Sequence, residues 1–220
     1  MRPYALRSVA VLVGVVIAAA ALTLYIGKYT RQPTPVAATA TGPGHAKLTL
    51  GTTPAVGSLG GNPTWVSYLV RRDGGWDHTT TYELPEDSLV DIRIYQFDSA
   101  TGLRNPFLSQ VQGTVGGEMK VDGRTVRSIE PAAASHTFTV PELGVIVPLP
   151  GVPEDASKQC EQMPCSLTDA HRTVEFTIRI PPGSDEYRWQ CFVPCAAGFV
   201  NGNGGPMQTV GYMDGYLRAG

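Results

Sequence analysis

Two short motifs in this chain carry residue types that bind copper. One is Cys191-x3-Cys195, which directly follows Gln190. The other runs from His136 to Gly144 and reads His-x-Phe-x-Val-Pro-x-Leu-Gly. Thiolate is a soft ligand that suits copper, and imidazole suits both oxidation states of that metal. The two motifs therefore predict a candidate metal centre, provided that folding brings their side chains together.

Alternating apolar residues predict the strands that must position these side chains. The alternation is clean over 173–180, 90–94, 136–140 and 187–191, and turn sequences rich in glycine, proline and aspartate separate the runs. After the first 31 residues, no segment shows a helical stripe of apolar residues over three turns. We therefore predict an all-β domain, a Greek-key sandwich. The period of two places Cys191 on the inward side, at the end of its strand.

The N-terminal part of the chain has a different composition. After a short tail over 1–8, the 19 residues of 9–27 contain no charge. A helix of that length spans about 28 Å, which is close to the thickness of the hydrocarbon core of a membrane. A signal peptide is the alternative, but apolar residues continue beyond its usual core, so we predict a single transmembrane anchor. Residues 28–62, rich in Pro, Gly, Ala and Thr, are predicted to be a linker to a domain over 63–220.

The charge of the chain limits which partners we expect, and its cysteine content indicates the cellular compartment. Beyond residue 31 there are 13 basic and 19 acidic residues, a net charge of −6. Nucleic acid binding needs a basic face, so we expect no nucleic acid partner. Four cysteines favour an oxidising compartment, which places the domain on the extracytoplasmic side of the cell membrane. No Gly-x-Ser-x-Gly motif supports a hydrolase.

The two motifs together resemble the copper A domain of cytochrome c oxidase subunit II, a member of the cupredoxin superfamily. The likeness covers about 80–97 and 135–219. It implies a cupredoxin-like fold in which His136 is the first copper ligand and Cys191 and Cys195 are bridging thiolates. The main-chain carbonyl of Val193 would be a further, weak ligand.

The chain also departs from that family. The second ligand histidine of the family falls at Phe199, and its ligand methionine falls at Gly202. Methionine reappears beyond a glycine-rich turn, at Met207 and Met213. About 38 residues, 98–135, separate the strand over 90–94 from the ligand strand, which is longer than the family pattern.

These departures leave two hypotheses open. In one, His136, Cys191, Cys195 and Met207 bind copper, as one ion or two, in a single-pass membrane protein. By the resemblance it would transfer electrons within a cytochrome c oxidase-type respiratory complex, with oxidase subunits or a cytochrome c as partners, and without catalysing a reaction alone. In the other, the fold is a metal-free accessory or interaction module, and Cys191 and Cys195 form a disulfide.

Cys160 and Cys165 lie in a long polar insertion between predicted strands. We expect them to form a disulfide that closes a surface loop rather than a metal site. Four cysteines allow three pairings, and sequence alone does not select one. Because both pairs are close in sequence, 160–165 and 191–195 is the simplest pairing.

Overall fold

The computed structural model describes residues 2–29, 34–196, 198 and 200–220, which belong to two compact units, Met1–Gln32 and Pro33–Gly220. The first unit is helix α1 (Arg2–Tyr29). Its segment Arg7–Gly27 is long and apolar enough to cross a membrane, and none of it is buried. A signal sequence has the same length and composition. The predicted single apolar helix at the N-terminus is therefore confirmed.

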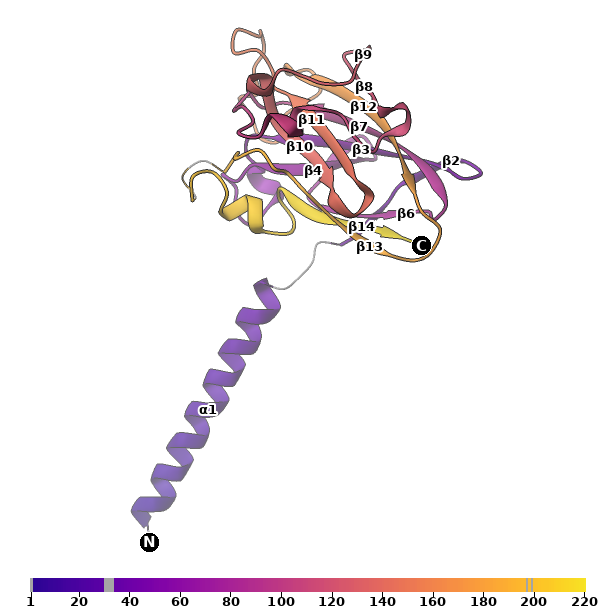
Figure 1. The fold of residues 1–220 in the computed structure, drawn as a ribbon. Helices are drawn as coiled ribbons and strands as arrows, with labels where there is room; N and C mark the ends of the chain where they lie inside the picture. The colour runs from indigo at the N-terminus through magenta and orange to yellow at the C-terminus, as the bar shows by residue number, and fades with distance from the viewer. Residues whose placement is uncertain (1, 30–33, 197, 199) are drawn as a thin grey trace. The chain divides into compact units, whose positions relative to one another are not determined.

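The second unit is a sandwich of two β-sheets (Figure 1). One sheet has six strands, in the order β1 (Val36–Ala37), β6 (Thr81–Leu84), β14 (Asp214–Ala219), β13 (Glu186–Gln190), β10 (Ala134–Val140) and β11 (Val145–Pro150). The other has the order β5 (Gly75–Asp77), β4 (Ser67–Arg72), β3 (His45–Thr53), β7 (Ser88–Gln96), β12 (Arg172–Ile180), β8 (Met119–Val121) and β9 (Arg124–Val126), and β2 (Thr39–Gly42) pairs with β3. Short 3-10 turns connect them: η1 (Gly57–Leu59), η2 (Pro106–Ser109), η3 (Val115–Gly117), η4 (Pro131–Ala133), η5 (Pro141–Leu143) and η6 (Gly205–Gln208). The predicted all-β sandwich is confirmed.

Aromatic side chains from both sheets fill the core between them. The rings of Phe138 on β10 and Phe176 on β12 have centroids 5.8 Å apart, and those of Tyr68 on β4 and Trp189 on β13 are 4.7 Å apart. Each fully buried side chain of this size contributes about 1.5–3 kcal/mol of hydrophobic stabilisation. The core therefore fixes the strands from which the candidate ligands project.

The alternation of more and less buried residues that the sequence predicts is present in β7 and β12 but absent from β10. Every residue of β10 is buried, including Thr137 and Thr139, which the period of two places on the opposite face from His136. The chain that follows β13 contacts this second face, where the Phe192 main-chain N–H donates to Thr137 Oγ1 at 2.9 Å. Local alternation gives the two faces of a strand, but only the fold shows that both are covered.

The linker predicted over 28–62 is corrected by the structure, although residues 30–33 lie outside the described residues. The second unit begins at Pro33 rather than at 63. Strand β3 pairs with both β4 and β7, so it lies inside the second sheet. Its inward residues Ala46, Leu48 and Leu50 are buried. These three alternate with polar residues, a short strand pattern that the surrounding glycine, proline and threonine obscured.

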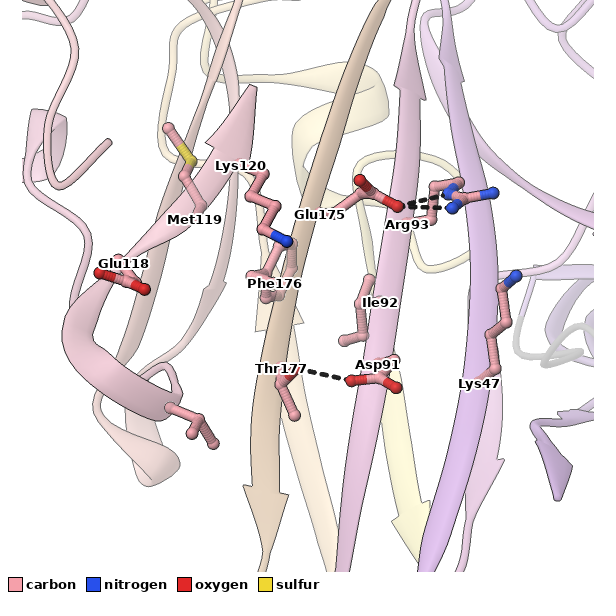
Figure 2. Close-up of a pocket in the computed structure, with 11 residues that line it drawn as sticks. Lys47, Asp91, Ile92, Arg93, Glu118, Met119, Lys120, Glu175, Phe176 and Thr177 are labelled. Atoms are coloured by element: carbon pink, nitrogen blue, oxygen red, sulfur yellow. Dashed lines mark hydrogen bonds and ion pairs between the residues drawn. The ribbon is translucent and has the colours of Figure 1, made fainter. Parts of the chain in front are cut away.

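The insertion over 98–135 contributes structure of its own. It contains η2, η3 and η4 and the antiparallel pair β8–β9, and β8 extends the second sheet by pairing with β12. Residues of β7, β12 and β8 line a groove of about 330 Å³ on this sheet. Figure 2 shows their side chains. Arg93 pairs with Glu175 there, and Thr177 donates to Asp91. Because Arg93 and Asp91 on β7 already have partners on the neighbouring strand β12, we interpret the groove as a solvated sheet face.

Candidate metal centre

His136 projects from β10 into the space between the two sheets. It shares the inward face of the strand with Phe138, and its side chain is buried. A register irregularity in the pairing of β10 with β11 lies between Ala134 and His136. Bulges of this kind re-aim side chains at the ends of strands. The imidazole is thus fixed by a strand in the core rather than by a loop.

The two candidate cysteines lie on the loop after β13, which neighbours β10 in the first sheet. Thr139 pairs with Gln190, so the residue after β13 lies beside the middle of β10. The main-chain N–H of Cys191 donates to Met213 O at 2.9 Å, and that of Cys195 donates to Val193 O at 2.8 Å. Sheet pairing therefore brings these thiols to His136 across more than fifty residues of sequence.

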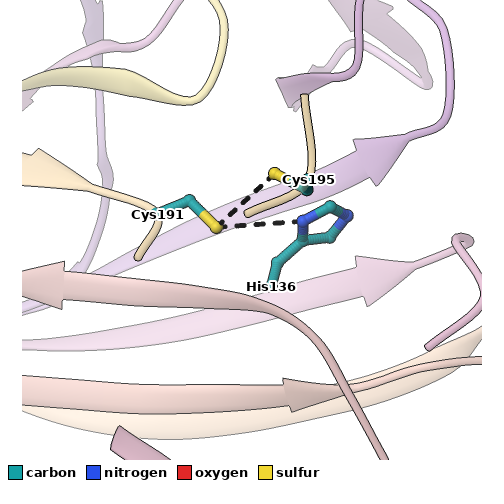
Figure 3. A group of neighbouring side chains, drawn as sticks. All are labelled: His136, Cys191 and Cys195. Atoms are coloured by element: carbon teal, nitrogen blue, oxygen red, sulfur yellow. Dashed lines mark hydrogen bonds between the residues drawn. The ribbon is translucent and has the colours of Figure 1, made fainter. Parts of the chain in front are cut away.

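The side chains of His136, Cys191 and Cys195 form one cluster (Figure 3). Cys191 Sγ lies 3.9 Å from His136 Nδ1 and 3.8 Å from Cys195 Sγ, and neither thiol is in a disulfide. A tetrahedral ion with bonds of about 2.3 Å to sulfur and about 2.0 Å to nitrogen separates two sulfurs by roughly 3.8 Å and sulfur from nitrogen by roughly 3.5 Å. The two distances from Cys191 Sγ are close to these values, and the three ligand atoms all lie within 4.8 Å of one another.

Met207 and Val193 border this cluster. Met207 Sδ lies 3.1 Å from Cys195 Sγ, and its side chain is buried. The amide of Gln190 donates to the Met207 carbonyl and fixes η6 next to the site. The carbonyl oxygen of Val193 lies 3.8 Å from Cys191 Sγ and accepts the N–H of Cys195. The Met207 thioether and the Val193 carbonyl therefore both lie beside the thiols, and both stay predicted ligands.

Other residues considered in the sequence lie elsewhere or cannot be placed. Phe199, where the family has its second histidine, is outside the described residues. Gly202 has no side chain to offer, and Met213 contributes its carbonyl to Cys191. A histidine outside the two motifs, His171, packs against the rings of Tyr95 and Phe97 and so lies outside the cluster. Among the described residues, only one group of histidine, cysteine and acidic side chains has the spacing of a metal site.

Sequence reasoning missed Asp98. Its Oδ2 lies 2.6 Å from His136 Nε2, and the residue is buried. A signal for it was present, since Asp98 continues the inward positions of β7 at Ile92, Ile94 and Gln96. A carboxylate at the inward position of an apolar strand pattern needs a polar partner.

Burial and mutual hydrogen bonds set the charge of the metal-free site. Burial alone would lower the pKa of His136, but its hydrogen bonds to Asp98 and Cys191 outweigh that effect and raise the pKa to about 9. Burial would raise the pKa of Cys191, yet hydrogen bonds with Cys195 and His136 lower that pKa well below the ordinary value. The pKa of Cys195 is raised, first by its hydrogen bond with Cys191 and then by burial. The site thus favours a thiolate, an imidazolium and a thiol.

The remaining cysteines form the expected disulfide. Cys160 and Cys165 are bonded to each other. Trp76 Nε1 donates to the Cys165 carbonyl at 2.9 Å, which ties the loop to the outer side of the second sheet. This disulfide is separate from the candidate metal centre.

Comparison with known proteins adds little to this description. No protein-family model and no curated protein matches the chain. Several solved structures that match are of rusticyanin. A point variant is 15% identical over 90% of this chain and 92% of that chain, with a TM-score of 0.35. Reduced rusticyanin is 14% identical over 90% and 93%, with a TM-score of 0.33, and rusticyanin from Thiobacillus ferrooxidans is 13% identical over 90% and 91%, with a TM-score of 0.32. TM-scores this low carry no argument about this chain.

Proposed function

We propose that this domain is a cupredoxin that binds one copper ion and exchanges single electrons with a protein partner. His136, Cys191, Cys195 and Met207 would hold the ion. The observation that carries the proposal is the cluster itself: the ligand atoms of His136, Cys191 and Cys195 lie within 4.8 Å of one another, and Met207 Sδ borders them at 3.1 Å from Cys195 Sγ. Bound copper would supply a centre that changes charge by one electron.

The contribution of the protein is a rigid and largely dry pocket. His136 is held by β10, Cys191 by the end of β13, and Met207 by η6. His136, Cys191 and Met207 are buried, so the ligands change little when the ion changes oxidation state. With one imidazole in the cluster, the described residues favour one ion over a symmetric pair.

The cellular setting is a further part of the proposal. We infer that α1 anchors the chain in the cell membrane and that the domain lies on the extracytoplasmic side, where the Cys160–Cys165 disulfide is stable. We also infer a partner in a cytochrome c oxidase-type complex. The motif resemblance supports that link, and the net charge of −6 would suit a basic partner such as a cytochrome c.

Copper titration of the full chain in detergent micelles tests the proposal. We expect one copper per chain and an intense visible band from thiolate-to-copper charge transfer. The band should disappear in Cys191→Ser and His136→Ala but remain in His171→Ala, a matched variant of a histidine outside the site. The hyperfine pattern in electron paramagnetic resonance distinguishes one copper nucleus from two.

The metal-free module is the competing outcome. A chain that stays colourless with freshly reduced thiols would refute the copper proposal. Recovery of Cys191 and Cys195 as a disulfide would then favour the accessory module. Their sulfurs lie 3.8 Å apart, so only a small movement would be needed to join them.

A further inference from the structure

Asp98 is a buried carboxylate beside the candidate ligands. Its Oδ2 lies 2.6 Å from His136 Nε2. Its main-chain N–H donates to Gln96 Oε1, and its carbonyl accepts from Gln96 Nε2, each at 2.8 Å, and from the N–H of Val152, also at 2.8 Å. Thr52 Oγ1 donates to the same oxygen of Gln96. Asp98 is therefore held in place by a buried polar network on β3 and β7.

This contact selects the nitrogen that His136 can offer to an ion. A neutral imidazole that donates its Nε2–H to a carboxylate has its lone pair on Nδ1, so an ion that displaces the second proton of the imidazolium binds at Nδ1. Nδ1 is the nitrogen that lies 3.9 Å from Cys191 Sγ. The ring orientation that Asp98 stabilises is thus the orientation that faces the sulfurs.

Asp98 also brings a negative charge close to the proposed ion. The 2.6 Å hydrogen bond, the width of the ring and a metal–nitrogen bond of about 2.0 Å place the carboxylate roughly 6–7 Å from the ion. Salt screens such a buried pair only weakly. By Coulomb's law the carboxylate attracts Cu(II) more strongly than Cu(I) at the same position.

We propose, on the basis of the copper site proposed above, that Asp98 is a positioning residue with two effects. It fixes His136 so that Nδ1 binds copper, and it biases the site towards the more highly charged oxidation state. The surplus negative charge thus lowers the reduction potential relative to the same ligands without Asp98.

Two substitutions separate the two effects. Asp98→Asn retains an oxygen that accepts the Nε2–H of His136 but removes the charge, whereas Asp98→Leu removes both. For an effective dielectric constant of about 20, the lost charge should weaken Cu(II) binding relative to Cu(I) binding on the order of 50-fold. Asp98→Leu should also weaken binding of both ions by about 10- to 100-fold, since the ring loses its support.

The experiment uses the full chain in detergent and measures Cu(I) affinity, Cu(II) affinity and reduction potential. Asp91→Asn is the matched control, because Asp91 is an exposed carboxylate on the opposite face of β7. We expect a higher potential and an unchanged charge-transfer band in Asp98→Asn, and no change in Asp91→Asn. An unchanged ratio of the two affinities in Asp98→Asn would overturn the inference while leaving the copper site intact.

A measurement on the unsubstituted chain does not depend on a variant that folds. Nitrogen NMR of the diamagnetic Cu(I) form should show His136 bound through Nδ1, with a slowly exchanging proton on Nε2. Copper bound through Nε2 would overturn the inference. Failure of the unsubstituted chain to bind copper at all would instead refute the proposed function, and this inference with it.

Discussion

The charge state of the metal-free site gives the sharpest prediction. A cysteine with the ordinary pKa of about 8.5 is roughly 3% thiolate at pH 7. Because the pKa of Cys191 is held well below its usual value, we expect close to one thiolate per chain at pH 7. His136→Ala removes the cation that stabilises this thiolate while the burial that opposes it remains. The hydrogen bond from Cys195 still lowers the pKa of Cys191, so we expect the thiolate fraction to fall below that of the unsubstituted chain rather than to vanish.

Ultraviolet absorbance of the thiolate measures this fraction in the metal-free protein. The absorbance of Cys191→Ser at pH 7 is subtracted from that of the unsubstituted chain. The disulfide-bonded cysteines make no contribution to this difference. His171→Ala serves as the matched control and should leave the difference unchanged. A difference below about half a thiolate, or a full thiolate in His136→Ala, would show that the ion pair does not form.

Three further predictions concern stability and the ligand set. Folding raises the pKa of His136 to about 9, so this residue contributes stability below about pH 6.5, and that stability is lost as the pH rises through 9. Folding lowers the pKa of Cys191, so this residue contributes stability above about pH 8.5, and that stability is lost as the pH falls through the pKa of the folded state. Between about pH 6.5 and 8.5 folding only moves a proton from sulfur to nitrogen, so urea denaturation of the metal-free protein should give a constant free energy of unfolding; a change above about 1 kcal/mol would contradict this. Replacing both Cys160 and Cys165 by serine should cost about 2 kcal/mol in denaturant melts, because the disulfide closes a loop with a sequence separation of 5, and should leave the copper band unchanged; loss of the band would show that the disulfide supports the site. Met207→Leu fills a similar volume without a thioether, so Cu(II) should bind about 10-fold more weakly relative to Cu(I), a rise of about 59 mV in potential, and an unchanged potential would exclude Met207 as a ligand.

Burial makes the site sensitive to changes at residues that bind no metal. Asp98, Gln96 and Thr52 are all buried, and they link the second sheet to the candidate ligand His136 on the first. A buried polar network is stabilising only when its members are satisfied. Substitutions in this network leave buried polar groups without partners, so they should affect both the site and the stability of the domain.

The sequence by itself determined the period of the strands and the local chemistry. The alternation over 173–180 and 90–94 predicted strands that the structure contains as β12 and β7. The short separation of Cys160 and Cys165 favoured their disulfide, and the uncharged run over 9–27 predicted the apolar helix. These features depend on neighbouring residues, so the order of residues is sufficient to predict them.

The tertiary structure decided which distant residues meet. Asp98 approaches His136 across 38 positions, and Met207 rather than Met213 turns its sulfur towards Cys195. Strand β3, which had been predicted to be linker, became a member of a sheet because β4 and β7 supply its partners. The physical reason is that a residue pattern sets which face a side chain occupies, whereas strand pairing at long sequence separation sets what lies opposite that face.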